Sequence, residues 1–333
     1  MQGEMLGYAY HHWAPVVSEV LEASGATIPL DDQSAYLQYP KYRWMFNKLL
    51  LSESQGLTAY PHGVEPQEVG VAEPVFSKPI FNLWGLSTGA RLIEKWSLAE
   101  YQAGHFWLPV LPDPQLSTDT VIDNGTILWT YTMRPTRNGQ ESFTSWETAT
   151  APAEVHDTIH AWVAEHLADF RGVANFETRG SWIIEAPPRM AIQFLDFYGP
   201  EWLSTVAGFY AGAAWSDPGQ GSKHGRSLVL RLPAEHANVR PQLRDRERLV
   251  ALEKETGCTV YLPWQNGQRL GDANDDGRSY RFGLVNAPDN TDATRMAYGL
   301  LDCLDGLPLD AATAGVLSAL QDHEHAICSH LAT

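Results

Sequence analysis

The chain has 333 residues, of which 44% are hydrophobic and 19% charged, which is the composition of a soluble globular protein. This length allows one large domain or a few small ones with an ample core. The 23 basic and 40 acidic residues give a formal charge of -17, which repels polyphosphate backbones and disfavours non-specific nucleic-acid binding. A free nucleotide can still bind in a locally positive, metal-containing cleft.

Sorting signals and cysteine pairs are not evident in the sequence. No apolar run approaches the length of a membrane span, and the N-terminal residues lack a basic region followed by an apolar one, so we expect a cytoplasmic protein. Cys258, Cys303 and Cys328 are odd in number and widely spaced, without a CxxC pair. We therefore expect reduced thiols and neither disulfides nor a structural zinc site.

Apolar periodicity and its breakers predict the elements of the first third of the chain. They are a helix over 14–25, a short strand over 27–30, a helix over 41–55, a Pro/Gly-rich connector over 60–74, a strand over 75–81, a glycine-bounded loop over 82–90, a helix over 91–102 and a strand over 105–111.

Hairpin signals dominate the middle of the chain. Two β-rich runs over 116–133 flank Asp123-Asn124-Gly125, a turn sequence whose asparagine and glycine tolerate positive φ. A helix over 155–170, a second hairpin over 173–186 and a helix over 201–215 follow. After these we expect strands over 227–233, 259–264 and 279–287 alternating with helices over 244–257 and 291–304. No long linker separates these pieces, so the pattern indicates an α+β or α/β chain with closely packed lobes.

Two acids and an arginine stand out in the second hairpin, in the segment FETRGSWIIEAPPR (176–189). On paired strands Glu177 and Glu185 can point to the same side and share a divalent ion, and Arg189 can reach the anion which that ion holds. Two carboxylates are the usual protein contribution to a Mg2+ site, with phosphate and water completing the octahedron. The alternative interpretation is a surface hairpin with ordinary charges.

Two lysines and a small-residue loop precede this hairpin. Lys48 lies in the predicted helix over 41–55, and Lys78 lies on the strand before the loop Gly85-Leu86-Ser87-Thr88-Gly89. Each also has an ordinary interpretation, as a solvated helix charge, a strand-edge lysine and a turn. Together they indicate a nucleotide site, because the lysines can neutralise phosphates and the loop offers backbone N–H groups and hydroxyls. The loop is neither a Walker A sequence nor a dinucleotide-binding one.

The order of these motifs resembles the ATP-grasp superfamily of carboxylate–amine ligases. The resemblance runs from about Lys41 to the end of the chain and rests on FNK at Lys48 and on SKPIFNLWGLSTGA, QLSTDTVIDNG and GVANFETRGSWIIEAPPR. It implies ATP and Mg2+ as cofactors and assigns a role to each motif. The implied ATP contacts are Lys48, Lys78, the loop residues Gly85, Ser87, Thr88 and Gly89, the adenine-binding strand at Trp107, Leu108 and Val110, and Gln115 near the ribose; Glu177 and Glu185 are the implied metal ligands, and Arg189 the catalytic residue.

The chain departs from the family pattern in three places. Pro187 stands where the family usually has an asparagine, so one metal contact is lost or replaced. Gln115 stands where a glutamate would contact the ribose. The region before Lys48 is also too short for the usual N-terminal α/β domain.

The resemblance implies an α+β chain with the ATP-grasp fold, in which two α/β lobes clasp a nucleotide. We expect a reduced N-terminal segment over 1–40, an N-lobe over 41–110 and a C-lobe with the metal site over 111–333. The implied reaction joins a small-molecule carboxylate to an amine through an acyl phosphate, releasing ADP and phosphate. The alternatives are a small-molecule kinase on the same scaffold and a catalytically weak nucleotide-binding scaffold protein. We expect no polymeric nucleic acid and no membrane as partners, and a homodimer is compatible with the sequence.

Overall fold

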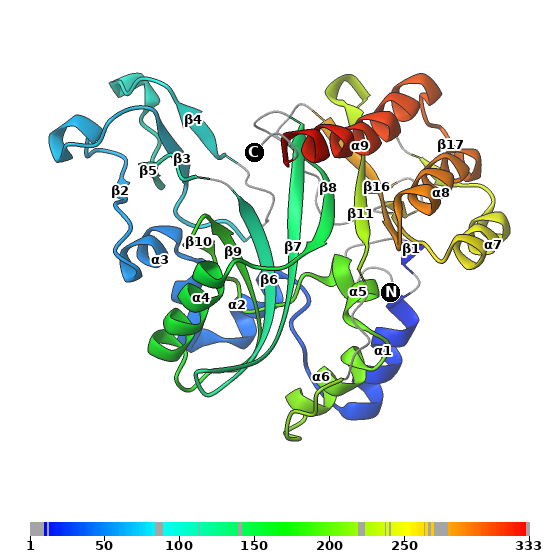
Figure 1. Cartoon of the computed structure of the whole chain (residues 1–333), viewed down its shortest axis with the longest axis horizontal. Coiled ribbons are helices and arrows are strands. Elements are labelled where there is room, and N and C mark those ends of the chain that lie inside the picture. Colours follow the sequence, from blue (N-terminus) through cyan, green and yellow to red (C-terminus); the bar gives the residue numbers. More distant parts are fainter. Residues whose placement is uncertain are drawn as a thin grey trace. The chain divides into compact units, whose positions relative to one another are not determined.

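The computed structural model describes residues 10–11, 13–83, 89–112, 114–138, 142–218, 224–236, 238–239, 241–262, 264–265, 268–269 and 279–330 (Figure 1). The chain forms two compact units. Unit 1 comprises Met1–Thr27, Arg134–Thr148 and Ile192–Thr333, and unit 2 comprises Ile28–Met133 and Ala149–Ala191. These discontinuous units differ from the expected contiguous division at residues 40 and 110, because strand β7 (Thr126–Asn138) passes from unit 2 into unit 1.

The larger sheet of unit 2 has the strand order β7-β6-β9-β10, with antiparallel neighbours β6 (Gln115–Asp123), β9 (Arg171–Arg179) and β10 (Trp182–Glu185). Both hairpins predicted from turn chemistry are present. In the first turn Asn124 and Gly125 adopt φ angles of 50° and 75°, the left-handed conformation that this turn requires.

One face of this sheet is apolar and the other polar, because side chains alternate along each strand. Leu116 and Ile122 of β6 pack with Ile159 and Trp162 of α4 (Ala153–His166), which covers the apolar face (Figure 1). Ser117 directly follows Leu116 on β6, so its side chain points to the opposite face. The helix predicted over 155–170 ends earlier, at His166.

A four-stranded antiparallel sheet forms the rest of unit 2, within the residues expected for the N-lobe. Its order is β2 (Tyr60–Pro61), β5 (His105–Pro109), β3 (Val75–Pro79) and β4 (Arg91–Ile93). Buried Phe106 and Leu108 pack with Leu57 on one side of the strands, while Trp107 packs with Val75 on the other. A short 3-10 helix, η3 (Pro66–Val69), lies between β2 and β3.

Three local predictions for the first third of the chain are wrong. The helix expected over 41–55 is split into a 3-10 helix, η2 (Pro40–Phe46), and α3 (Lys48–Ser54), because the Asn47 side chain caps α3 by accepting from the Leu50 N–H at 3.0 Å. The segment over 91–102 forms β4 and a 3-10 turn, η4 (Leu98–Glu100), because Arg91–Ile93 pairs with β3. Residues 27–30 form no strand and lead into α2 (Asp32–Gln38), which was not predicted.

Unit 1 is a sheet with helices, in the strand order β1-β13-β16-β11-β8-β7. Its helices α8 and α9 pack on β11 and β16 through a cluster that includes Leu230, Val285, Met296 and Val316. Its strands are β1 (Tyr10–His11), β8 (Ser142–Ala149), β11 (Arg226–Pro233), β13 (Thr259–Leu262), β16 (Ser279–Ala287) and the short pairs β12 (Gln242–Leu243) with β17 (Leu304–Asp305) and β14 (Trp264–Gln265) with β15 (Gln268–Arg269). Its helices are α1 (Trp13–Ser24), η5 (Ile192–Phe194), α5 (Leu195–Tyr198), α6 (Trp202–Tyr210), η6 (Ala234–His236), α7 (Arg246–Thr256), α8 (Asn290–Cys303) and α9 (Leu309–His330).

Antiparallel sheets and helices together make the chain an α+β protein, as predicted. Over the described ranges, none of the helices is long and apolar enough to cross a membrane.

Candidate functional site

A buried polar layer lies on the face of the unit 2 sheet opposite α4. Ser117 and Asp119 of β6 stand directly across from Glu177 and Asn175 of β9. The Asn175 Nδ2 donates to Ser117 Oγ at 2.9 Å and to Asp119 Oδ1 at 2.6 Å, and all three residues are buried. Burying polar groups is tolerated when they bind one another, so this layer is a connected network built into the sheet.

The two acids of the second hairpin meet on this face. Glu185 of β10 is the register partner of Glu177 on β9, next to an irregularity between Ile183 and Glu185. Directly opposed residues of antiparallel strands point to the same face. The Glu177 carboxylate accepts from Gln115 Nε2 at 3.2 Å. Gln115 therefore contacts an acid that was predicted to bind metal.

Lys48 reaches Glu185 from the first residue of α3. Its Nζ forms an ion pair with Glu185 Oε1, and the Lys48 side chain is only 7% exposed. The backbone here is fixed as well, because the Lys48 N–H donates to the Ile80 carbonyl at 2.9 Å. The break of the helix at Asn47 thus places this lysine over the acid pair.

Lys78 reaches the same place from β3. Its Nζ donates to the Ile184 carbonyl at 3.0 Å and lies 5.7 Å from the centre of the Phe106 ring. Burial, with the nearby charge of Lys48, lowers the pKa of Lys78 from 10.5 to about 8, against the opposing effect of Glu185 and Glu177. A buried cation whose charge is this costly is typical of a site that awaits an anion.

Opposing effects act on Glu185. Burial raises the pKa of this carboxyl, but the positive charges of Lys48 and Lys78 outweigh burial and hold the pKa below its ordinary value. Glu185 is therefore an ionised carboxylate at neutral pH, paired with Lys48.

Arg189 lies four residues beyond Glu185 and is also buried among charges. Its Nε donates to Asp32 Oδ1 at 2.6 Å, and its Nη1 faces the Met190 carbonyl at 3.4 Å. Burial lowers the pKa of the guanidinium, but Asp32, helped by Asp119 and Glu177, raises it above its ordinary value. The arginine is permanently charged.

Pro187, at the position where ATP-grasp ligases usually have an asparagine, contributes its backbone carbonyl. Its carbonyl accepts from the Asn175 N–H at 3.0 Å and from the Arg189 N–H at 2.8 Å. The first bond ties the segment that carries Arg189 to the polar layer, and the second closes a turn within that segment. No side chain at position 187 can bind a metal.

The remaining predicted contacts lie in the four-stranded sheet. Trp107 and Leu108 are buried in its core, and the Trp107 Nε1 donates to the Val64 carbonyl at 2.7 Å. Val110 follows β5 and is 46% exposed. Gly89 has a φ angle of 79°, and a Cβ there would lie 3.2 Å from His105 Nε2. Adenine binding by this strand stays a prediction, and Gly85, Ser87 and Thr88 lie outside the described residues.

The donor set fits a Mg2+ ion that comes with a nucleotide. Glu177 and Glu185 supply two adjacent hard oxygen donors, which is what a protein usually gives to a nucleotide-bound Mg2+. Over the described ranges there is no group of three or more His, Cys, Asp or Glu residues that could hold a metal. The acid pair therefore suits a metal that also has phosphate oxygens as ligands, and Lys48 would have to give up its partner.

A buried histidine and serine in unit 2 lie close together but do not form a base–nucleophile pair. His62 Nε2 lies 2.9 Å from Ser77 Oγ, and both residues are buried. His62 Nδ1 accepts from the Gln102 N–H at 2.9 Å, so the proton of the neutral ring is on Nε2. The imidazole therefore donates to Ser77 and cannot act as a base toward it.

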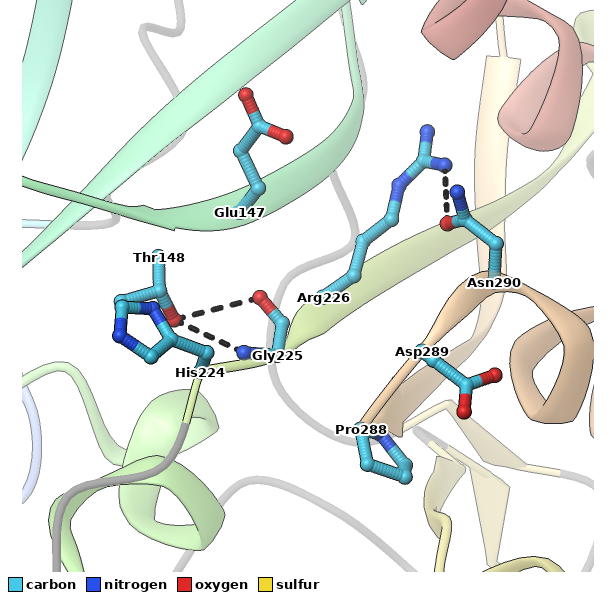
Figure 2. A pocket seen from close by; sticks show the side chains of 8 residues that line it. All are labelled: Glu147, Thr148, His224, Gly225, Arg226, Pro288, Asp289 and Asn290. Atoms are coloured by element: carbon cyan, nitrogen blue, oxygen red, sulfur yellow. Dashed lines mark hydrogen bonds between the residues drawn. The ribbon is translucent and has the colours of Figure 1, made fainter.

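Unit 1 contains a cavity of about 250 Å³ formed by β8, the start of β11 and the start of α8 (Figure 2). Arg226 donates to Asn290 Oδ1 at 2.9 Å, and the Gly225 N–H donates to Thr148 Oγ1 at 3.1 Å. Both bonds join residues that line the cavity. None of the residues predicted to form the site lies in this cavity.

Three residues of the site were not identified from the sequence. Asp119 and Asn175 had a signal, because polar residues alternate along β6 and β9, although the partners in the layer depend on strand register. Asp32 had no such signal, since it lies far from Arg189 in the sequence.

The fold is shared with known ligases. No family model matches the chain, and no curated protein matches it in sequence. Solved structures do match, each with a low sequence identity. The L-amino acid ligase from Bacillus licheniformis has a TM-score of 0.53 and 10% identity over 89% of this chain and 78% of its own. N5-carboxyaminoimidazole ribonucleotide synthetase from Thermotoga maritima has a TM-score of 0.54 and 12% identity, over 87% and 84%.

A third match, carboxyaminoimidazole ribonucleotide synthase from Aspergillus clavatus complexed with ATP, has a TM-score of 0.53 and 10% identity, over 80% of this chain and 75% of that one. The chain therefore has the ATP-grasp fold, as the motif order predicted.

Proposed function

We propose that this protein is an ATP- and Mg2+-dependent ligase that joins a small-molecule carboxylate to an amine. One observation carries the proposal: within an ATP-grasp fold, the charges of two buried lysines and a half-buried arginine act on the acid pair Glu177 and Glu185, and Lys48 forms an ion pair with Glu185. Charges of both signs are costly to bury, and such an arrangement is kept where it binds a charged ligand.

The lysines bind the nucleotide. Lys48 now pairs with Glu185, and ATP phosphates would replace that carboxylate as its partner. Lys78, whose pKa is about 8, gains a counter-charge when phosphate arrives and becomes fully protonated. Glu177 and Glu185 would hold the Mg2+ ion, which would supply positive charge to neutralise the charge that shifts during phosphoryl transfer.

Arg189 acts in the two chemical steps of the reaction. The substrate carboxylate attacks the terminal phosphorus of ATP, forming an acyl phosphate while ADP leaves. An amine then attacks the acyl carbon, and phosphate leaves as the amide-like bond forms. The guanidinium of Arg189 stabilises the transferred phosphoryl group in both steps, and no protein nucleophile is needed.

ADP and phosphate release measured with ATP, Mg2+ and a panel of carboxylates and amines tests the proposal. We expect release that requires both a carboxylate and an amine, and the productive pair identifies the substrates. The Glu177→Gln variant is the matched control, since Gln has a similar volume and no charge. Absence of ATP binding in calorimetry would refute the proposal.

Product analysis separates the ligase from its alternatives. A stable phosphorylated product without an amide indicates a kinase on the same scaffold. ATP affinity without turnover for any acceptor indicates a nucleotide-binding scaffold protein, an alternative motivated by Pro187 and Gln115.

A further inference from the structure

Arg189 is held by an acid from the N-terminal part of unit 2. Asp32 Oδ1 accepts from Arg189 Nε at 2.6 Å, and the two side chains are 10% and 20% exposed. Asp32 is the first residue of α2, whose start is fixed by a capping box. In this box Asp31 Oδ1 accepts from the Ser34 N–H at 2.6 Å. The carboxylate that binds Arg189 therefore sits on a fixed backbone.

The backbone around Arg189 is also held on both sides. Before it, the Pro187 carbonyl accepts from the Asn175 N–H. After it, the Ala191 N–H donates to Asp119 Oδ2 at 2.8 Å. With the chain tied at both ends, the direction of the arginine side chain is the remaining freedom, and Asp32 sets it.

The contact leaves one end of the guanidinium available. Asp32 takes Nε, and Met190 O lies beside Nη1. Among the residues that the structure describes, none accepts a hydrogen bond from Nη2 of Arg189. A guanidinium bound through Nε presents its outer N–H groups in a fixed direction, which suits recognition of a planar or tetrahedral oxyanion.

We propose that Asp32 is a positioning residue that aims Arg189 at the transferred phosphoryl group. This inference rests on the proposed function, in which Arg189 touches that group. Asp32 does not touch the substrate and acts only through the arginine. The inference predicts that replacing Asp32 slows the chemical step and leaves the affinity for ATP, which the two lysines bind, unchanged.

Asp32→Ala and Asp32→Asn are the test variants, and Asp31→Asn is the matched control because asparagine caps a helix as well as aspartate does. The measurements are kcat and the KM for ATP, each also in an Arg189→Ala background. Calorimetric binding of ADP, Mg2+ and aluminium fluoride, which imitates the transferred phosphoryl group, gives a second readout that needs no acceptor. Circular dichroism checks that each variant is folded.

We expect Asp32→Ala to lower kcat and aluminium fluoride affinity by about tenfold to a hundredfold, as expected for loss of a charge-assisted hydrogen bond. The KM for ATP should stay within about twofold, since a transition-state interaction is lost. Asp32→Asn keeps an acceptor oxygen and should lose less, because a neutral bond has roughly half the strength. In the Arg189→Ala background Asp32→Ala should cause no further loss.

Three results would overturn the inference and leave the proposed function intact. They are a loss in Asp32→Ala that adds fully to that of Arg189→Ala, an equal loss in Asp31→Asn, and an Asp32→Ala protein that binds the phosphoryl mimic as tightly as the wild type. A wild-type protein that neither turns over ATP nor binds the mimic would refute the proposed function itself.

Discussion

Replacing Lys78 by methionine should make the protein more stable and unable to bind ATP tightly. Methionine is unbranched and flexible, so it can fill the space of the lysine stem on β3 without the ammonium. Lys78 is only 6% exposed, and its pKa of about 8 shows that its charge is unfavourable in the folded protein without a ligand.

The magnitude follows from proton linkage. An unfolded lysine has its ordinary pKa of 10.5, and the folded one has a pKa of about 8, so the folded protein binds fewer protons between these values. At about 1.4 kcal/mol per pH unit, the charged ammonium costs roughly 3 kcal/mol of unfolding free energy at pH 7. The cost decreases as pH rises from 8 to 10.5, where the folded lysine is already neutral, and is roughly 1.4 kcal/mol at pH 9.5.

Urea denaturation of the wild type and Lys78→Met at both pH values measures this difference. We expect the variant to be more stable by about 3 kcal/mol at pH 7 and by about half as much at pH 9.5. ATP affinity in calorimetry should fall by about tenfold to a hundredfold, with loss of a charge-assisted bond. Exposed Lys95 gives the control, since Lys95→Met should change neither quantity. A Lys78→Met protein that is less stable, or that binds ATP like the wild type, would refute the reasoning.

Three further predictions follow from the charges of unit 2. Glu185→Gln should abolish ADP release and lower the unfolding free energy by about 3 kcal/mol, because it leaves buried Lys48 unpaired. Glu177→Gln should also abolish ADP release but lower the unfolding free energy less. Equal stability of the two variants would contradict this prediction. ATP affinity should fall above pH 8, by up to about tenfold per pH unit, as unliganded Lys78 loses its proton; constant affinity to pH 10 would remove this lysine from the site. Burial, with the nearby charges of other residues, lowers the pKa of His62 to about 4, so unfolded protein binds more protons below pH 6.5. From pH 7 to pH 5 the wild type should therefore lose about 2 kcal/mol more stability than His62→Gln in urea denaturation, and parallel losses would show that His62 stays solvated.

The hairpins were predictable from the sequence because their signals are local. Asn124-Gly125 demands a tight turn, and the alternation of side chains along paired strands determines which residues share a face. The same logic placed Glu177 and Glu185 together, since two strands joined by a short turn have a narrow choice of register.

The helix expected over 91–102 failed because tertiary contacts override local propensity. Arg91–Ile93 completes the edge of the four-stranded sheet, and the Trp96 N–H donates to Glu73 Oε1 at 2.6 Å. The ion pair of Asp32 with Arg189 could not be foreseen for a related reason. Its partners come from α2 and from the segment after β10, and only the folded unit brings them together.

In the proposed function, the charges of unit 2 would require a nucleotide to bind before the two glutamates can take a metal. Lys48 pairs with Glu185 and the nearby charge of Lys78 also acts on it, so a divalent cation alone would meet two positive charges as well as two negative ones. Phosphate oxygens would change this balance, because they would give the lysines new partners and allow the carboxylates to bind the cation. The same exchange removes the cost of burying Lys78. We therefore expect nucleotide binding, metal binding and protonation of Lys78 to be thermodynamically coupled, because both lysines and both acids belong to the same unit.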